Sequence, residues 1–323
     1  MREREKVQDL RAGGTVDSTF LVQEKELRGF TRKEGYYLQV KLGDSTGSIW
    51  AKCWDKAKEV AASFAPGDIV HIKGMVNSFK GRLQLIFEPD GVEISTQHNI
   101  AEFLPTTARD VNTMLDNLEK TAKSMRNEHL KQLIFSFLHD FEFVKAFKNA
   151  PAAKIHHHNY IGGLLEHTHS VVTLCRIIAR LYPELDRDLL LSGAILHDIG
   201  KTAVYDYTFQ IEVTEEGGLM EHIILGYRMV GAKIDTIAGF PRELRLRLLH
   251  LILSHHNFGD WGSPVKPLFV EAQALCYADL LDAQLNEFLH LQKQEEAKGK
   301  EGVWSDYSRR IDRFIYLGKS SKD

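Results

Sequence analysis

Over roughly its first hundred residues the chain alternates between apolar and polar side chains with a period of two. This alternation is typical of strands that bury one face. It predicts strands over 19–27, 36–42, 48–54, 69–76 and 82–94, with a short helix over 56–64. A helix between the third and fourth of five short strands is the element order of an OB-fold, so we expect a five-stranded OB-like β-barrel.

After the barrel, apolar residues recur at spacings of three and four, which predicts helices. The change of period and the length of 323 residues both favour more than one domain. We therefore expect a multi-domain α+β protein. Its parts are an OB-fold domain over 1–98, a helical connector over 99–155, an all-α domain over 156–294 and a C-terminal tail over 295–323.

The alternation also assigns the faces of the barrel strands. If the apolar residues of 38–42 point inward, then Tyr37 and Lys41 point outward, as do Trp50 and Lys52 on the next strand. The aromatic and basic positions of this face and of the turn near residue 80 are Tyr37, Lys41, Trp50, Lys52, Phe79, Lys80 and Arg82. Aromatic rings among cations suit single-stranded nucleic acid, on whose bases they stack. Alternatively, Tyr37 and Trp54 cover the base of the barrel or a domain interface.

Composition limits the classes of function. The chain has 43% hydrophobic and 26% charged residues, which is ordinary for a globular protein, and its net charge of −3 requires any polyanion site to be a local patch. Cys53, Cys175 and Cys276 are scattered, which favours buried thiols in a reducing compartment. No apolar run approaches the ~18 residues of a membrane span, and the charged start is unlike a signal peptide. We expect a cytoplasmic protein that does not enter a membrane.

One apolar stretch, residues 193–201, carries adjacent polar side chains in the order Gly-Ala-Ile-Leu-His-Asp-Ile-Gly-Lys. Burying His197 and Asp198 without partners would cost ~1–3 kcal/mol each. Coordination of a metal ion would offset this cost. The alternative is a hydrogen-bonded core histidine beside a capping aspartate.

Other residues able to bind a metal lie in further segments with helical spacing. They are His167, His222, His255, His256 and Asp279. Together with His197 and Asp198 they form a mixed nitrogen and oxygen donor set. Such a set favours Mn, Fe, Co, Ni or Zn over Mg or Ca.

This ordered set resembles the two-metal version of the HD-domain metallohydrolase superfamily. The resemblance implies one ion bound by His167, His197, Asp198 and Asp279, and a second bound by Asp198, His222, His255 and His256. Two ions roughly 3.5–4 Å apart can hold a bridging hydroxide and promote hydrolysis of a phosphate ester. Asp198 would then be catalytic as the shared ligand, and residues 156–294 would be an HD domain.

Three further residues have two interpretations each. Lys201 either neutralises a phosphate oxygen of the substrate, which would make it catalytic, or is a favourable cation at a helix C-terminus. His157 and His158 belong to a run of three histidines. They either contact substrate phosphate or form a solvated start to the next helix.

Short motifs extend the resemblance to YhaM-type bacterial 3′–5′ exoribonucleases. These are Ala-Lys-Cys-Trp-Asp at 51–55, Met-Arg-Asn at 125–127, His-His-Asn at 157–159, Leu-His-Asp-Ile-Gly-Lys at 196–201, Leu-Ser-His-His at 253–256 and Trp-Gly-Ser-Pro at 261–264. The family implies hydrolysis of single-stranded RNA, and of single-stranded DNA as a further substrate, with two divalent ions such as Mn, in a homo-oligomer. Two alternatives remain. One is an HD enzyme for free nucleotides or cyclic dinucleotides with a regulatory barrel, and the other is a nucleic-acid-binding scaffold.

Overall fold

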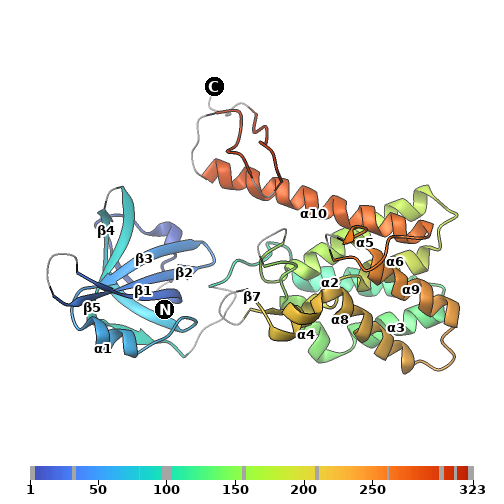
Figure 1. The fold of residues 1–323 in the computed structure, drawn as a ribbon, viewed down its shortest axis with the longest axis horizontal. Coiled ribbons are helices and arrows are strands. Elements are labelled where there is room, and N and C mark those ends of the chain that lie inside the picture. The colour runs from blue at the N-terminus through green and yellow to red at the C-terminus, as the bar shows by residue number, and fades with distance from the viewer. Residues whose placement is uncertain are drawn as a thin grey trace. The chain divides into compact units, whose positions relative to one another are not determined.

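A computed structural model shows two compact units (Figure 1). It describes residues 4–30, 34–79, 81–96, 103–154, 158–207, 211–259, 262–297, 302–308 and 311–318. The first unit comprises residues 1–106 with 206–212, and the second comprises 107–205 with 213–323. The helices expected in a connector therefore belong to the second unit, while the four-part division made from the sequence stays a prediction.

The first unit is a closed β-barrel. Its elements are β1 (Thr15–Gly29), β2 (Tyr36–Asp44), β3 (Gly47–Cys53), α1 (Ala57–Ala62), β4 (Ile69–Phe79) and β5 (Arg82–Ile94), after a 3₁₀ turn, η1 (Val7–Asp9). The strand order around the barrel is β1-β2-β3-β5-β4, in which β3 and β5 are parallel and the other neighbouring pairs are antiparallel. The predicted OB-like barrel, with its helix between the third and fourth strands, is confirmed.

Alternation along the strands fills the barrel. Leu38, Val40 and Leu42 of β2 are at most 1% exposed, and Ala51 and Cys53 of β3 are fully buried. Gly74 permits a close approach where β4 meets β5, since a Cβ atom there would lie 2.4 Å from the carbonyl oxygen of Ile86. A β-bulge beside this glycine bends β4 as a closed barrel requires.

Burial departs from simple alternation at Gln39. Its position on β2 is one of the outward-facing ones, yet the residue is 9% exposed. Cross-strand neighbours Glu26 of β1 and Lys52 of β3 lie on either side of it and cover it. The outer face is therefore open at some positions and covered at others.

The second unit is helical. Its helices are α2 (Val111–Lys123), α3 (Glu128–Leu138), α4 (Phe141–Asn149), α5 (Gly163–Leu181), α6 (Arg187–Leu196), α7 (Lys201–Val204), α8 (Glu215–Asp235), α9 (Arg242–Ser254) and α10 (Val270–Ala297). Five of them begin at a side chain that accepts a hydrogen bond from a free backbone N–H, namely at Asp110, Asn127, Asp140, Asp186 and Thr214. Between α7 and α8, the short strands β6 (Tyr205–Asp206) and β7 (Glu212–Val213) pair.

The C-terminal segment folds back against the end of α10 (Figure 1). Backbone bridges pair Trp304 with Tyr316 and Ser308 with Arg313. The buried carboxylate of Glu295 on α10 accepts a hydrogen bond of 3.1 Å from the backbone N–H of Asp306. In the described part of the chain, none of the helices combines the length and the hydropathy that a membrane crossing requires.

Candidate metal centre

Five helices of the second unit deliver the seven candidate ligands to one place. His167 comes from α5, His197 and Asp198 from the end of α6, His222 from α8, His255 and His256 from the end of α9, and Asp279 from α10. Among the described residues, two of the three donor groups consist entirely of these side chains, and the ligand atoms within each group lie within 4.8 Å of one another. Residues up to 112 positions apart in the chain are thus adjacent.

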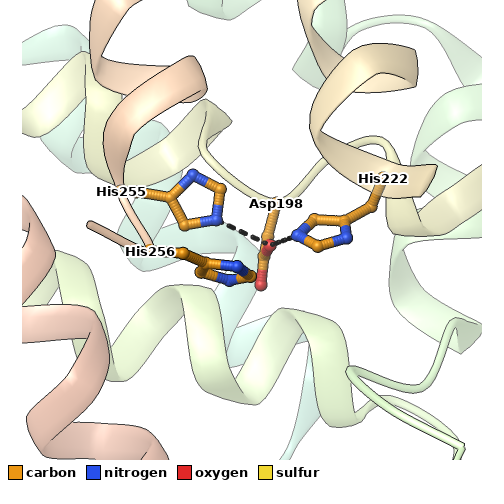
Figure 2. Close-up of side chains that lie close together, drawn as sticks. All are labelled: Asp198, His222, His255 and His256. Atoms are coloured by element: carbon orange, nitrogen blue, oxygen red, sulfur yellow. Dashed lines mark ion pairs between the residues drawn. The ribbon is translucent and has the colours of Figure 1, made fainter. Parts of the chain in front are cut away.

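The first group surrounds one oxygen of Asp198. Oδ1 of this carboxylate lies 3.4 Å from Nε2 of His222 and 3.5 Å from Nε2 of His255 (Figure 2). His256 completes the group and lies beside the carboxylate, to its left in the same view. Three imidazoles and a carboxylate are a donor set typical of transition-metal sites.

The second group surrounds the other oxygen. Oδ2 of Asp198 lies 3.5 Å from Nε2 of His167 and 3.4 Å from Nε2 of His197. Oδ1 of Asp279 lies 3.0 Å from the same atom of His167. Asp198 therefore presents one oxygen to each group, which is the arrangement that a bridging ligand requires.

Unpaired atoms show that the site suits cations. Oδ1 of Asp198 and Nε2 of His222 and of His255 are buried without a hydrogen-bond partner among the described residues. Nδ1 of His255 donates to the carbonyl oxygen of Ile252 over 2.8 Å, so the lone pair of Nε2 faces the carboxylate. Two lone pairs facing each other in a buried site are unfavourable, and a cation between them removes the penalty.

The second group also contains a ring nitrogen whose lone pair faces the site. Nδ1 of His197 donates to the carbonyl oxygen of Ala194 over 2.9 Å, which again leaves Nε2 with a lone pair directed at the site. That atom lies 3.2 Å from Nε2 of His167. Two ring nitrogens so close share either a proton or a metal ion.

Close helix packing depends on two glycines near the His-Asp pair. A Cβ atom on Gly200 would lie 2.0 Å from the carbonyl oxygen of His222, so only glycine lets α8 approach the turn that carries Asp198. On Gly193, a Cβ atom would lie 2.6 Å from the side chain of Leu251 on α9. These close approaches explain why glycine stands at both positions within the apolar stretch 193–201.

Backbone strain marks the edges of the centre. Glu221, directly before His222, has φ 60° and ψ 158° inside α8, and Asn257, directly after His256, has φ 63°. A positive φ angle is energetically unfavourable for most residues other than glycine. Residues in such conformations cluster at functional sites, where the surrounding structure holds them in place. The interruption of α8 sets the direction in which the His222 imidazole leaves the helix.

A second layer of polar residues supports His167. Its Nδ1 lies 2.7 Å from Oδ2 of Asp282, which also accepts from Nε2 of His158 at 3.0 Å. Nδ1 of His158 contacts the hydroxyl of Tyr160 at 2.8 Å, and this hydroxyl donates to Glu166. A carboxylate behind a metal-binding imidazole fixes its orientation and tautomer. From the sequence, Asp282 has two interpretations: it lies three residues after Asp279 on nearly the same side of a helix, so it either supports the site or has a surface or capping role. In the structure it supports His167.

Charge and burial shift the pKa values in this centre. Burial alone lowers the pKa of His167, but hydrogen bonds to Asp279 and Asp282 outweigh it and raise the pKa to about 10. Burial, reinforced by His255, lowers the pKa of His256 to about 3. His256 is therefore a neutral ligand across the physiological range, whereas His167 must lose a proton before it can bind a metal ion.

Lys201 lies inside the centre rather than at the end of α6. It is the first residue of α7, is 6% exposed, and its Nζ donates to Oδ2 of Asp198 over 2.6 Å. Burial opposes the charge of Lys201, but Asp198 outweighs this effect and raises the pKa of the ammonium. Likewise, burial would raise the pKa of Asp198, but Lys201 and His197 hold it well below its usual value. The position does not fit the alternative of a cation at a helix C-terminus.

Of the two histidines that the sequence offered as contacts to substrate phosphate, the structure describes only one. His157 lies outside the described residues. His158 is 2% exposed, and both its ring nitrogens bond to protein groups. A ring held in this way supports His167 and is unsuited to contact a substrate phosphate.

On the barrel, the structure brings several predicted nucleic-acid contacts together. Tyr37 and Trp54 have ring centroids 5.0 Å apart. Nζ of Lys52 lies 5.4 Å from the Trp54 ring and 5.8 Å from the rings of Tyr37 and Phe79. Phe79 is 57% exposed. These four residues form one aromatic cluster around a cation, which we call the Lys52 cluster.

The remaining predicted contacts are more scattered. Lys41 and Trp50 are cross-strand neighbours, but the ammonium of Lys41 pairs with Glu24 at 2.7 Å. Arg82 is exposed at the start of β5, and Lys80 lies outside the described residues. The ion pair partly neutralises Lys41, so the Lys52 cluster is the stronger candidate for stacking with bases.

Comparison with known proteins agrees with both units. Residues 164–284 match the model of the HD domain, and residues 20–89 match that of the OB-fold nucleic acid binding domain. The protein is therefore an HD-domain hydrolase that also carries an OB-fold barrel. It is 36% identical over 278 residues to the 3′-5′ exoribonuclease YhaM of Bacillus subtilis (strain 168). The aligned region covers 85% of this chain and 86% of the relative. The chain belongs to the YhaM family.

Two solved structures are similar to part of the chain. The second OB-fold domain of replication protein A from Methanococcus maripaludis is 20% identical, with a TM-score of 0.24, over 30% of this chain and 99% of that chain. The replication factor A related protein from Methanobacterium thermoautotrophicum is 25% identical, with a TM-score of 0.26, over 30% of this chain and 96% of that chain.

Proposed function

We propose that this protein is a metal-dependent 3′–5′ exoribonuclease that hydrolyses phosphodiester bonds of single-stranded RNA, with single-stranded DNA as a further substrate. The observation that carries the proposal is the position of Asp198, which presents Oδ1 to His222 and His255 and Oδ2 to His167 and His197. The activity named for the relative from Bacillus subtilis supports the direction and the substrate.

Two divalent ions fit the donor set, with Mn as the first candidate and Fe, Co, Ni or Zn as alternatives. One ion would be held by His167, His197, Asp198 and Asp279, and the other by Asp198, His222, His255 and His256. When bound, such a pair supplies Lewis-acid stabilisation of the charge that develops on an attacked phosphate and activates water for the attack.

The protein's own groups complete the proposed site. Lys201 holds Oδ2 of Asp198 and adds a positive charge close to where a phosphate would bind. Asp282 keeps the imidazole of His167 directed at the centre. On the barrel, the Lys52 cluster offers stacking faces and a cation to a single strand, which favours a polymer over a free nucleotide.

We also propose that the protein forms a homo-oligomer through α10. Leu281, Leu285 and Leu289 are 46%, 55% and 56% exposed, and their spacing of four residues places them on one side of the helix. A stripe of exposed leucines buries its apolar surface when two copies pack together. Multi-angle light scattering should show a smaller species for Leu285→Glu, whereas an unchanged mass would exclude this face.

The central experiment follows end-labelled single-stranded RNA and DNA incubated with the Mn-loaded protein. We expect shortening from the 3′ end with release of mononucleotides. Asp198→Ala should abolish hydrolysis and lower the metal content while RNA binding stays near normal. Full activity and full metal content in Asp198→Ala would contradict the bridging role. Hydrolysis of free nucleotides or cyclic dinucleotides, with RNA left intact, would instead support an enzyme with a regulatory barrel.

A further inference from the structure

A large cleft in the second unit opens beside the metal centre. Its volume is about 880 Å³, within the ~300–1,000 Å³ typical of small-molecule sites. Its lining includes His255, His256 and Asp279 of the metal centre and also Ile311, Asp312 and Arg313 of the C-terminal segment. One cleft therefore joins candidate metal ligands to a part of the chain that the proposed function does not use.

One face of α10 forms the floor of this cleft. Tyr277, Leu280, Gln284 and Phe288 recur at spacings of three and four residues, so they lie in one row along the helix. Tyr277 is 60% exposed, and Phe258, from the loop after α9, is 48% exposed. Aromatic side chains that are exposed in a cleft offer flat apolar surface to a ligand.

We propose that this cleft holds the nucleobase of the 3′-terminal nucleotide while its phosphate lies at the metal centre. The site would therefore accept nucleoside 5′-monophosphates as well as strand ends, and this proposal rests on the proposed function. Its occupant must carry an anionic group that suits imidazoles and divalent ions, next to a flat group that suits aromatic rings. A nucleotide combines these two features within one residue.

Polar groups of the cleft suit the edges of a base. The side-chain amides of Asn257 and Gln284 can each donate and accept hydrogen bonds. Asn257 follows His256 directly and has φ 63°, a conformation that asparagine adopts more readily than most residues. Amides that can both donate and accept fit any of the four bases. We therefore expect the cleft to bind bases without strong selection among them.

The test measures binding of adenosine 5′-monophosphate and of ribose 5-phosphate to the Mn-loaded full-length protein by calorimetry. Tyr277→Ala removes one ring, and Tyr277→Phe retains it. Tyr182→Ala is the matched control, because Tyr182 is also 60% exposed but lies at the end of α5, away from the cleft. Phe258→Ala removes a second ring that lines the cleft, from the loop after α9, and is an independent second variant.

Wild-type protein should bind adenosine 5′-monophosphate more tightly than ribose 5-phosphate. Tyr277→Ala should weaken binding of the nucleotide by about 5- to 150-fold, equivalent to ~1–3 kcal/mol for one stacked base. Tyr277→Phe and Tyr182→Ala should bind it as the wild type does. Binding of ribose 5-phosphate should be alike in all variants, because it carries no base.

Equal affinity of the wild type for the two ligands would overturn the proposal. So would unchanged nucleotide affinity in both Tyr277→Ala and Phe258→Ala. Hydrolysis of RNA is measured separately on the wild type. If RNA is not hydrolysed while the nucleotide affinities follow the expected pattern, the proposed exoribonuclease function fails and the nucleotide cleft stands.

Discussion

Nζ of Lys201 lies 2.6 Å from Oδ2 of Asp198, and both side chains are almost completely buried. The same oxygen lies within 3.5 Å of the imidazoles of His167 and His197. One carboxylate thus interacts with a permanent cation as well as with both groups of candidate ligands. The ammonium neutralises part of the charge of Asp198 before any metal ion binds.

Replacement of Lys201 by methionine should destabilise the metal-free protein strongly. Breaking a buried ion pair by removing one partner costs ~3–5 kcal/mol because the other charge stays buried. At about 2–4 °C per kcal/mol for larger domains, the melting temperature should fall by roughly 6–20 °C. Mn should restore much of this loss, since it also neutralises Asp198. Turnover of RNA should fall about ten- to a hundred-fold through the lost charge-assisted contact to phosphate.

Lys123→Met is the matched control for that experiment. Lys123 pairs with Glu119 at 3.3 Å on the surface of α2, and such a pair contributes at most ~0.5 kcal/mol. Its melting temperature and turnover should match those of the wild type. A Lys201→Met protein with normal turnover in the presence of Mn would remove Lys201 from the catalytic residues and leave it a structural role.

Replacement of Asp282 by asparagine should weaken metal binding without unfolding the protein. The amide is nearly isosteric, but it cannot accept from both His158 and His167 with the strength of a carboxylate. Loss of a carboxylate behind a ligand histidine typically lowers metal affinity by about 10- to 100-fold. Titration with Mn measures this change, and Asp235→Asn, at an exposed ion pair, is the control. Unchanged Mn affinity in Asp282→Asn would show that Asp282 does not position His167.

Local rules predicted the barrel, and they drew attention to the histidines and aspartates that the structure brings together. Period-two alternation assigned the buried faces of β2 and β3 because register in a barrel follows from which face is apolar. The ligands were visible because buried histidines and aspartates in apolar segments require a partner. Resemblance to a known family then sorted them into two groups.

What the sequence left open or did not reveal depends on contacts between distant helices. Asp282 contacts His167 only because α10 packs against α5, 115 positions apart in the chain. Gly200 is required because the backbone of α8 passes next to it, which no local pattern indicates. Spacing placed Lys201 just past a helix end, but its contact with Asp198 follows from the turn between α6 and α7.

Metal binding should release a proton from His167. Burial lowers its pKa, but Asp279 and Asp282 raise it to about 10, so the ring is charged at neutral pH without metal. Mn affinity should therefore rise about tenfold per pH unit between pH 7 and 9. In the metal-free protein, the raised pKa contributes stability that is complete below pH 6.5 and lost as the pH rises through 10. The gain in melting temperature on adding Mn should accordingly increase with pH.

Calorimetry in buffers with different heats of ionisation measures this proton directly. The observed heat of Mn binding should vary with the buffer at pH 7.5. His256 should contribute no proton there, because burial and His255 lower its pKa to about 3. Binding heats that are independent of the buffer, together with an affinity that does not change with pH, would contradict a charged His167 in the metal-free protein.

The Lys52 cluster should determine affinity for long single strands rather than the rate of bond cleavage. Tyr37→Ala removes one stacking face and should weaken RNA binding by about 5- to 150-fold, at ~1–3 kcal/mol per stacked base. Lys52→Gln should lower the dependence of binding on salt, because one fewer phosphate is neutralised. Neither variant should change hydrolysis of bis-(p-nitrophenyl) phosphate, because this small ester is not a strand that the barrel could hold. Lys41→Gln is the control, because its ammonium already pairs with Glu24. Parallel losses on RNA and on the small ester would show that the cluster serves folding or assembly instead.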